Sequence, residues 1–234
     1  ATIDMMINYA DFALFRAKAL GSIKREFSVE EYVAECNSYS DSKLLTGLIY
    51  DNNFSYCFQP IVSTVDGSVY AYEALMRPKN SSPLEVLRIA REHGRLYDIE
   101  RLTFENVLEI ISANRARFGE KKIFLNSIPD SMITEYDFNR LCEKYGNIMS
   151  QLVIEFTEQA DLTGDKIASL RYLFKSKSCM IAIDDYGSGY SNTAAVLSLQ
   201  PDVIKVDRSL IADINTNVKK QHFLTGIIDF ARLN

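Results

Sequence analysis

Strand-like apolar runs and helical patterns alternate through most of this chain, and this alternation restricts its fold more than any other feature. From residue 56 onward, six short runs rich in β-branched and aromatic residues are expected to be strands; they span 56–63, 68–77, 122–128, 151–158, 180–187 and 202–210. Between the later runs, and after the last one, apolar residues recur at the helical spacing. Strands that alternate with helices in this way predict an α/β fold with a mostly parallel sheet.

The first two predicted strands differ from the later ones. They are separated by Asp66-Gly67, a dipeptide typical of tight turns, so they are expected to pair as an antiparallel hairpin. Helices are expected at 83–117 with a break near His93-Gly94, and then at 132–145, 165–176, 192–199 and 218–233. A closed barrel needs eight strands. The sequence therefore predicts either an open sheet or a chain that ends about two β-units early.

The first 50 residues have a different, helical character. Residues 1–20 follow the helical period and precede Gly21, a plausible helix terminator. A second helix is expected to begin after Ser28, a good N-cap residue. The polar stretch 36–43 predicts a bend before another helical piece at 44–50.

The composition excludes several functional classes. The chain has 234 residues, of which 47% are hydrophobic, and these suffice for a sizeable core. The formal net charge is −5 and no basic patch stands out, which argues against a nucleic-acid polymer as partner. A single nucleotide or a metal ion remains compatible with this charge.

Cysteine usage and hydropathy suggest a cytoplasmic location. The four cysteines are far apart and form no C-x-x-C pair; they are Cys36, Cys57, Cys142 and Cys179. With only two histidines they form no recognisable zinc site, so reduced thiols are expected. No apolar run approaches the length of a membrane span, and no signal peptide is visible. The chain starts with Ala1 in mid-pattern and resembles a piece of a longer protein, whose other parts could carry an anchor.

Polar side chains interrupt the predicted strands near their C-terminal ends, where buried parallel strands are normally apolar. They are Glu73, Asn126, Glu155, Asp184, Asp185, Lys205 and Asp207. A single strand-end carboxylate is usually a helix cap or a turn former. Polar groups from five strands are harder to explain in this way, because the C-terminal ends of parallel strands meet at the active-site edge of α/β folds.

A divalent cation is the simplest partner for such a group of carboxylates. A buried, isolated carboxylate costs several kcal/mol or more unless it is paired, neutralised or bound to metal. Lys205 and Arg77 alone are not expected to satisfy four converging acidic groups. Mg²⁺, Mn²⁺ and Ca²⁺ all take carboxylate and amide oxygens as ligands. Because Asp184 and Asp185 point to opposite sides of a strand, they could reach two cations.

Other interpretations of these residues remain open. The stretch "GSGYSN" (187–192) could be a phosphate-binding glycine loop, but it lacks the third glycine of a dinucleotide fingerprint and follows two carboxylates. Lys205 could form a structural ion pair with Asp207 or another carboxylate. It could also be a Schiff-base nucleophile in an unrelated barrel enzyme, although surrounding carboxylates would keep it protonated.

From about Tyr56 to its end, the chain resembles the EAL domain family of cyclic di-GMP phosphodiesterases. Five motifs of that family occur in order: "YEALMR", "FLNSIPD", "IEFTE", "DDYGSG" and "IKVDRSLI". The fourth carries Tyr and Ser where the family has Phe and Thr. The resemblance implies a TIM-like (β/α)₈ barrel with an antiparallel first strand, here truncated after about six strands. It also implies hydrolysis of cyclic di-GMP to linear pGpG in bacterial second-messenger signalling.

The resemblance also implies roles for individual residues. The ligands of Mg²⁺ or Mn²⁺ would be Glu73, Asn126, Glu155, Asp184 and Asp185, with Asp185 at the second of two metals. The catalytic residues would be Lys205, near the attacking water, together with Glu73 and Asp185. Substrate would contact Arg77, Gln59 and Leu75. Glu158 would brace the loop after Asp185, and Asp207 is a weaker candidate for the site.

A second resemblance concerns the N-terminal segment. "YADFALFRAKALG" (9–21) is similar to the last helix of a GGDEF domain. This predicts two regions: residues 1–50 as the end of a GGDEF domain and a helical linker, and residues 51–234 as the EAL domain. The rest of a GGDEF domain would precede this chain in the same polypeptide, which could also carry a sensor domain, and unpaired sheet edges would favour a homodimer.

The chain departs from the EAL pattern at its C-terminal end. The family's EGVE-type strand and a later glutamine are absent, so the first metal site is complete and the second is not. The parent protein is expected to be an active phosphodiesterase, and this chain by itself to have little or no activity. The alternative is a catalytically inactive module that binds cyclic di-GMP or a protein partner.

Overall fold

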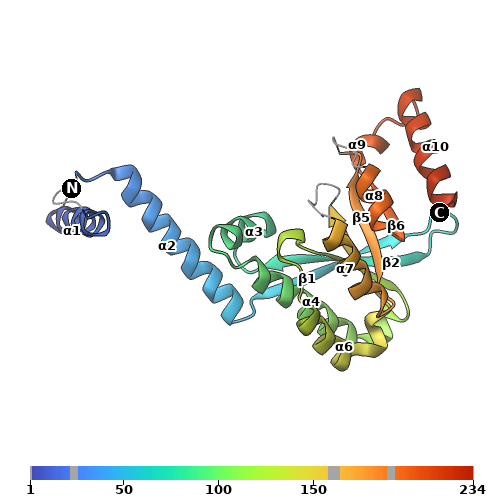
Figure 1. The fold of residues 1–234 in the computed structure, drawn as a ribbon, viewed down its shortest axis with the longest axis horizontal. Coiled ribbons are helices and arrows are strands. Elements are labelled where there is room, and N and C mark those ends of the chain that lie inside the picture. The colour runs from blue at the N-terminus through green and yellow to red at the C-terminus, as the bar shows by residue number, and fades with distance from the viewer. Residues whose placement is uncertain (1, 22–25, 158–163, 189–192, 234) are drawn as a thin grey trace.

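The computed structural model describes residues 2–21, 26–157, 164–188 and 193–233 (Figure 1). Its strands are β1 (Phe54–Val62), β2 (Val69–Pro78), β3 (Lys122–Asn126), β4 (Leu152–Thr157), β5 (Met180–Tyr186) and β6 (Val203–Val206). Its helices are α1 (Ile3–Ala19), α2 (Val29–Tyr50), α3 (Pro83–Glu92), α4 (Leu96–Ala113), α5 (Arg115–Phe118), α6 (Glu135–Met149), α7 (Gly164–Lys175), α8 (Thr193–Leu199), α9 (Arg208–Ile211) and α10 (Val218–Leu233), with a 3₁₀ turn η1 (Pro129–Ser131).

The described strands form one sheet in the sequence order β1-β2-β3-β4-β5-β6. β1 and β2 pair antiparallel, and each later pair of neighbours is parallel. The predicted α/β fold with an antiparallel first strand is therefore confirmed. In the part of the chain that the structure describes, the sheet is open, with β1 and β6 at its edges, and its strand order is compatible with a TIM-like barrel.

The outer face of the sheet is covered by helices through a core of aromatic side chains. Phe104 on α4, Phe138 on α6 and Phe174 on α7 are buried and pack together with Phe156 of β4. Burial of one such ring stabilises the fold by roughly 1.5–3 kcal/mol. This core holds the parallel strands in register, so the strand ends are fixed relative to one another.

The inner face of the sheet carries an apolar layer below a polar one. Ala71, Phe124, Val153 and Ala182 form a buried cluster, and Val203 packs against it. Successive side chains along a strand alternate between faces, so the residue two positions further on each strand lies on the same face. These residues are Glu73, Asn126, Glu155, Asp184 and Lys205. The polar layer is thus a direct consequence of the strand period.

Two expectations about local structure are wrong. Residues 36–43 do not bend, because they lie inside the continuous helix α2; this stretch contains no Gly or Pro, and its polar side chains are mostly exposed on the helix. The sixth strand is shorter than predicted. It ends at Val206 because Asp207 is the N-cap of α9, where its side chain accepts a hydrogen bond from the backbone N–H of Ser209.

The N-terminal helices make a small aromatic contact of their own. Tyr9 and Phe12 on α1 pack against Phe27 and against Tyr32 on α2. Several large apolar side chains of α1 remain exposed, including those of Ile3, Met6 and Phe15. None of the described helices is both long enough and apolar enough to cross a membrane.

Candidate metal centre

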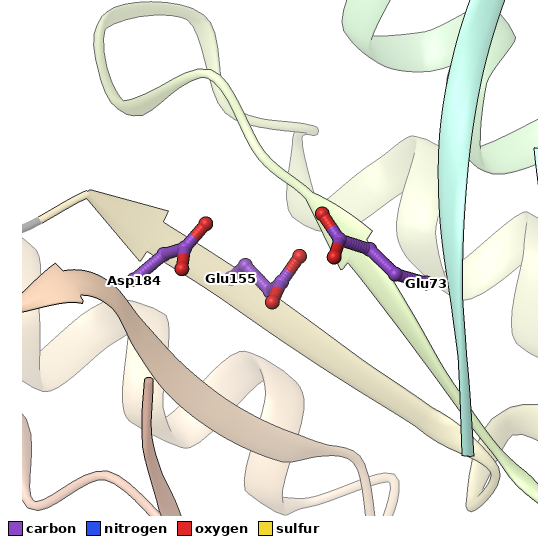
Figure 2. A group of neighbouring side chains, drawn as sticks. All are labelled: Glu73, Glu155 and Asp184. Atoms are coloured by element: carbon purple, nitrogen blue, oxygen red, sulfur yellow. The ribbon is translucent and has the colours of Figure 1, made fainter. Parts of the chain in front are cut away.

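Three carboxylates from three strands converge at the C-terminal edge of the sheet. Glu73 comes from β2, Glu155 from β4 and Asp184 from β5, and one oxygen of each lies within 4.8 Å of the others. Figure 2 shows the three side chains directed toward a common region. Coulomb repulsion among them opposes this arrangement, so positive charge is required nearby.

Lys205 supplies part of that positive charge. Its Nζ lies 2.5 Å from an oxygen of Glu155, 3.1 Å from Asp184 and 3.3 Å from Glu73. Burial alone would lower the pKa of Lys205, but the carboxylates, Glu155 foremost, outweigh it, so the pKa lies above its usual value. Lys205 is therefore a cation held among the three carboxylates. Of the alternative partners considered for Lys205, the structure shows nearby carboxylates, and none of its described ion pairs involves Asp207.

Glu155 is the most enclosed member of the group. Its side chain is fully buried, and its Oε2 has no hydrogen-bond partner among the described residues. Burial raises the pKa of Glu155 to about 7, although Lys205 opposes the rise. A buried oxygen without a partner is costly. The described residues therefore provide no hydrogen-bond donor for this oxygen of the centre.

Asn126 joins the group from β3. Its Nδ2 donates a hydrogen bond to Oε1 of Glu73 over 3.4 Å. In the sheet register Asn126 lies opposite Glu155. The structure therefore brings four of the five predicted metal ligands together: Glu73, Asn126, Glu155 and Asp184.

Asp185, the fifth predicted ligand, lies at a distorted strand end. Its φ is +54°, a conformation that is strained for a residue with a side chain. Its backbone N–H donates to Oδ1 of Asp184, and its carboxylate is exposed rather than part of the three-carboxylate group. Burial, followed by the charge of Asp184, raises the pKa of Asp185.

The loop after Asp185 is shaped by Gly187. This residue has a φ of +93°, and a Cβ built on it would lie 2.1 Å from Cδ1 of Leu210. Leu210 on α9 thus packs against a backbone that only glycine can provide. The rest of the predicted glycine loop, 189–192, lies outside the described residues, as does Glu158.

The predicted substrate contacts lie beside the carboxylates. A pocket of about 380 Å³ is lined by Leu75, Arg77 and Asn126, among others. Arg77 is exposed and its guanidinium donates to the carbonyl of Met76, so it does not neutralise the carboxylates. Gln59 on β1 is opposite Glu73 in the antiparallel register. Opposed residues of such a pair share a face, so Gln59 also lies on the inner side.

Asp207 is placed differently from the strand-end carboxylates. Its Oδ1 accepts a hydrogen bond from Ser209 N–H over 2.8 Å. Hydrogen bonding from the side chain of Ser209, and then from its backbone, lowers the pKa of Asp207. Its backbone N–H donates to the carbonyl of Tyr186. Asp207 therefore ties β6 to the end of β5, and its side chain is committed to capping α9.

One buried acidic residue of the described chain was not predicted from the sequence. Glu100 on α4 has no exposed surface, and it lines the same pocket as Arg77 and Asn126. Its position could have been noticed, because it interrupts the apolar stripe formed by Leu96, Phe104 and Val107 on an otherwise amphipathic helix.

The donor set fits a hard divalent cation. Three carboxylates surround a single ammonium, so with all three in the charged form the strand ends would carry a formal charge of −2. The amide of Asn126 adds a further oxygen, and the buried Glu155 Oε2 finds no partner in the described part of the chain. Carboxylate and amide oxygens are the ligands that Mg²⁺ and Mn²⁺ prefer.

Fold and site together define an α/β protein with an acidic centre at the carboxyl ends of its strands. Residues 42–233 match the family model described as "EAL domain". The chain belongs to the EAL domain family, as the motifs predicted.

Similar proteins of known name or structure agree with this family. The cyclic di-GMP phosphodiesterase PdeF of Escherichia coli (strain K12) is 32% identical over 192 residues, which are 78% of this chain and 25% of PdeF. The structure of Klebsiella pneumoniae BlrP1 in a manganese and cyclic di-GMP complex at pH 9.0 has a TM-score of 0.65 and 25% identity, covering 77% of this chain and 47% of that one.

A structure with lower sequence identity shares the fold over most of both chains. The Xanthomonas citri FimX EAL domain in complex with c-diGMP has a TM-score of 0.74 at 18% identity, covering 86% of this chain and 82% of that one. This chain matches only a part of the length of its named relatives. This chain spans 25% of PdeF and 30% of the Pseudomonas aeruginosa cyclic di-GMP phosphodiesterase NbdA.

Proposed function

We propose that this chain carries the catalytic EAL domain of a metal-dependent phosphodiesterase that hydrolyses cyclic di-GMP to linear pGpG. The observation that carries this proposal is the convergence of Glu73, Glu155 and Asp184 from separate strands, with a buried Glu155 oxygen that no described residue bonds. The names of PdeF and of the BlrP1 complex support the choice of substrate and cofactor.

Mg²⁺ or Mn²⁺ would be held by oxygens of the strand-end residues. The first cation would take Glu73, Asn126, Glu155 and Asp184, and the second would take Asp185. When bound, the cations would supply a water of lowered pKa and stabilise negative charge on the phosphate. The strained backbone at Asp185 supports its role, because such strain is often found at functional sites.

The remaining site residues would bind and orient the substrate. Lys205 stays protonated among its carboxylates and would place its ammonium near the attacked phosphodiester, where it orients water and offsets developing charge. Arg77, at the pocket wall, would contact a phosphate. Leu75 and Gln59 would contact the nucleotide from the same face of the sheet.

Glu158 and Asp207 would act indirectly. Glu158 would brace the loop that follows Asp185. Asp207 would hold the junction between β6 and α9, which its hydrogen bond to Ser209 supports.

The N-terminal region would connect the EAL domain to a second domain. Residues 1–50 would be the last helix of a GGDEF domain and a linker, and 51–234 the EAL domain. The exposed apolar side chains of α1 support a neighbouring domain in the same polypeptide. The protein would be a cytoplasmic homodimer, for which the exposed edge strands of the described sheet offer a pairing surface.

Asp184→Asn tests the catalytic proposal. In the whole protein that carries this chain, the release of pGpG from cyclic di-GMP should fall at least about 100-fold, because a metal ligand loses its charge. The assay is chromatography of the nucleotides with Mg²⁺ or Mn²⁺ present. Asp213→Asn, at an exposed residue after α9 and outside the carboxylate group, is the matched control and should change the rate by less than about two-fold.

Binding without cleavage would give a different result. If the unmodified protein binds cyclic di-GMP in Mn²⁺ but releases no pGpG, the protein is a receptor and the catalytic proposal is wrong. Equal rates for the protein with and without Asp184→Asn would also contradict it.

A further inference from the structure

Glu100 is a buried carboxylate that the proposed chemistry does not use directly. It lies on the inward face of α4, between the apolar residues Leu96 and Phe104 at one helical turn on either side. An apolar side chain would suit this position better, since an unpaired buried carboxylate costs several kcal/mol. The residue must therefore be held by specific hydrogen bonds.

The described hydrogen-bond partners of Glu100 all lie in the segment that follows β3. Its Oε1 accepts from the hydroxyl of Ser127 over 2.5 Å, and its Oε2 accepts from the backbone N–H of Ile128 over 2.9 Å. Burial raises the pKa of Glu100 to about 7, while hydrogen bonds from this segment, including one from Ile133 N–H, oppose the rise. The carboxylate thus binds two consecutive residues through both of its oxygens.

The residues held by Glu100 come directly after Asn126. Ser127 also donates its backbone N–H to the carbonyl of Glu155 over 3.0 Å. Its main chain is thereby fixed to β4 and its side chain to α4. Asn126, one residue earlier, donates to Glu73. Ser127 and Ile128 also line the pocket that contains Leu75 and Arg77.

We propose that Glu100 is a positioning residue that fixes the end of β3, so that Asn126 faces the carboxylate centre and the Ser127–Ile128 wall of the pocket keeps its shape. This proposal rests on the proposed function, because it assumes that the centre holds a cation and the pocket a nucleotide. Glu100 has no exposed surface, so it would act through Ser127 and Ile128.

The hydrogen-bond chemistry predicts which substitutions preserve this role. Glutamine can accept from Ile128 N–H through its oxygen and donate to the Ser127 hydroxyl through its amide. Leucine can do neither, although it is similar in size and suits an apolar position. The Ser127 hydroxyl makes one of the two hydrogen bonds described above. Ser127→Ala therefore removes that hydrogen bond and leaves Glu100 in place.

The experiment compares Mn²⁺ binding and nucleotide binding in four variants of the whole protein. Calorimetry gives the Mn²⁺ affinity, and steady-state kinetics separate KM from kcat. We expect Glu100→Leu to weaken Mn²⁺ binding about 10–100-fold and to raise KM for cyclic di-GMP. Ser127→Ala should have a smaller effect in the same direction. Glu100→Gln should stay within about three-fold of the unmodified protein, and so should Glu105→Gln, the control on the same helix.

The outcomes separate positioning from simple stabilisation. Thermal unfolding is measured in parallel, and Ser127→Ala, a small change, provides the test if Glu100→Leu does not fold. A lower melting temperature with unchanged Mn²⁺ affinity and KM in Ser127→Ala and Glu100→Leu would overturn the proposal. An equal loss of affinity in Glu100→Gln and Glu100→Leu would also overturn it, because charge rather than hydrogen-bond geometry would then matter.

Failure of the proposed function would give a distinct pattern. If the unmodified protein binds Mn²⁺ and cyclic di-GMP without cleaving it, the catalytic proposal fails while the ordered series of affinities still supports Glu100 as a positioning residue. If the unmodified protein binds no Mn²⁺, both proposals are wrong.

Discussion

Two cations of this protein each contact three carboxylates, but in opposite settings. Arg88 on α3 pairs with Glu85 and Glu92 of its own helix and with Asp41 of α2. Lys205 pairs with Glu73, Glu155 and Asp184 from three strands of the sheet. The Arg88 partners have side chains 25–54% exposed, whereas the Lys205 partners are only 0–19% exposed.

The hydrogen bonds of the two groups differ as well. Arg88 donates directed hydrogen bonds to all three of its partners, and water can complete the rest. Lys205 leaves Glu155 Oε2 buried, with no hydrogen-bond partner within residues 2–21, 26–157, 164–188 and 193–233. The exposed group is therefore satisfied as it stands, and it ties α2 to α3. The buried group is under-neutralised, and a divalent cation would complete it. Both groups consist of one cation and three carboxylates. The exposed group contributes to helix packing and the buried group to the candidate metal site, and the difference between them is burial.

The two groups should differ most in how much stability the protein loses when the cation of each group is removed. Lys205→Met leaves three neighbouring carboxylates without their cation, and we expect the free energy of unfolding to fall by about 3–5 kcal/mol in the absence of divalent ions. Arg88→Met should have a much smaller effect that disappears at high salt, because exposed pairs are weak and screened. Urea unfolding followed by circular dichroism measures both, with Lys219→Met as an exposed-lysine control.

Added Mn²⁺ sharpens the same test. A cation that binds only the folded state stabilises it, so Mn²⁺ should restore more stability to Lys205→Met than it adds to Arg88→Met. Equal losses in the two variants, or no selective rescue by Mn²⁺, would show that the two groups are equivalent.

The contributions of a buried and an exposed carboxylate to the free energy of unfolding should also change in opposite directions with pH. The pKa of Glu100 is about 7 in the folded protein, above its ordinary value of 4.5. Between pH 4.5 and pH 7 the folded state therefore keeps a proton on Glu100 that the unfolded state has lost. Stability from this group is complete below pH 4.5 and is lost as the pH rises through 7. Glu100→Gln should remove this part of the pH dependence, which amounts to roughly 3 kcal/mol.

Glu85 provides the control of opposite sign. Its hydrogen bond from Arg88 lowers the pKa of Glu85, so its contribution is present above pH 4.5 and is lost as the pH falls. Tyr56 lies near Glu100, because its pKa is raised by burial and, in smaller part, by the charge of Glu100. Arg77 and Arg91 line the same pocket as Glu100. Parallel stability curves for Glu100→Gln and the unmodified protein from pH 4.5 to 8 would refute the assignment.

The sequence was sufficient to predict the sheet because strand signals in this chain are strong. Apolar runs rich in β-branched residues identified all six described strands, and Asp66-Gly67 identified the hairpin. The two errors have local causes. The polar residues at 36–43 predict a bend, but no Gly or Pro interrupts the helix there. Asp207 continues the alternation of the sixth strand, so the sequence pattern does not distinguish its capping role from a strand position.

The site was predictable in its members but not in its internal contacts. Strand-end polarity and the family motifs both selected Glu73, Glu155, Asp184 and Lys205. The triple ion pair of Lys205 depends on strand curvature and register, which a sequence pattern does not define. Glu100 was missed because it belongs to no motif, and its role depends on the distance between α4 and the end of β3, elements that are separated in sequence.

The central claim is that Glu73, Glu155 and Asp184 form a divalent cation site, and its most direct test is anomalous diffraction at the manganese edge. Crystals of the protein grown with Mn²⁺ should show an anomalous peak within coordination distance of all three carboxylates and of the Asn126 amide oxygen. A peak only at other sites, or none while Mn²⁺ is bound in solution, would contradict the claim.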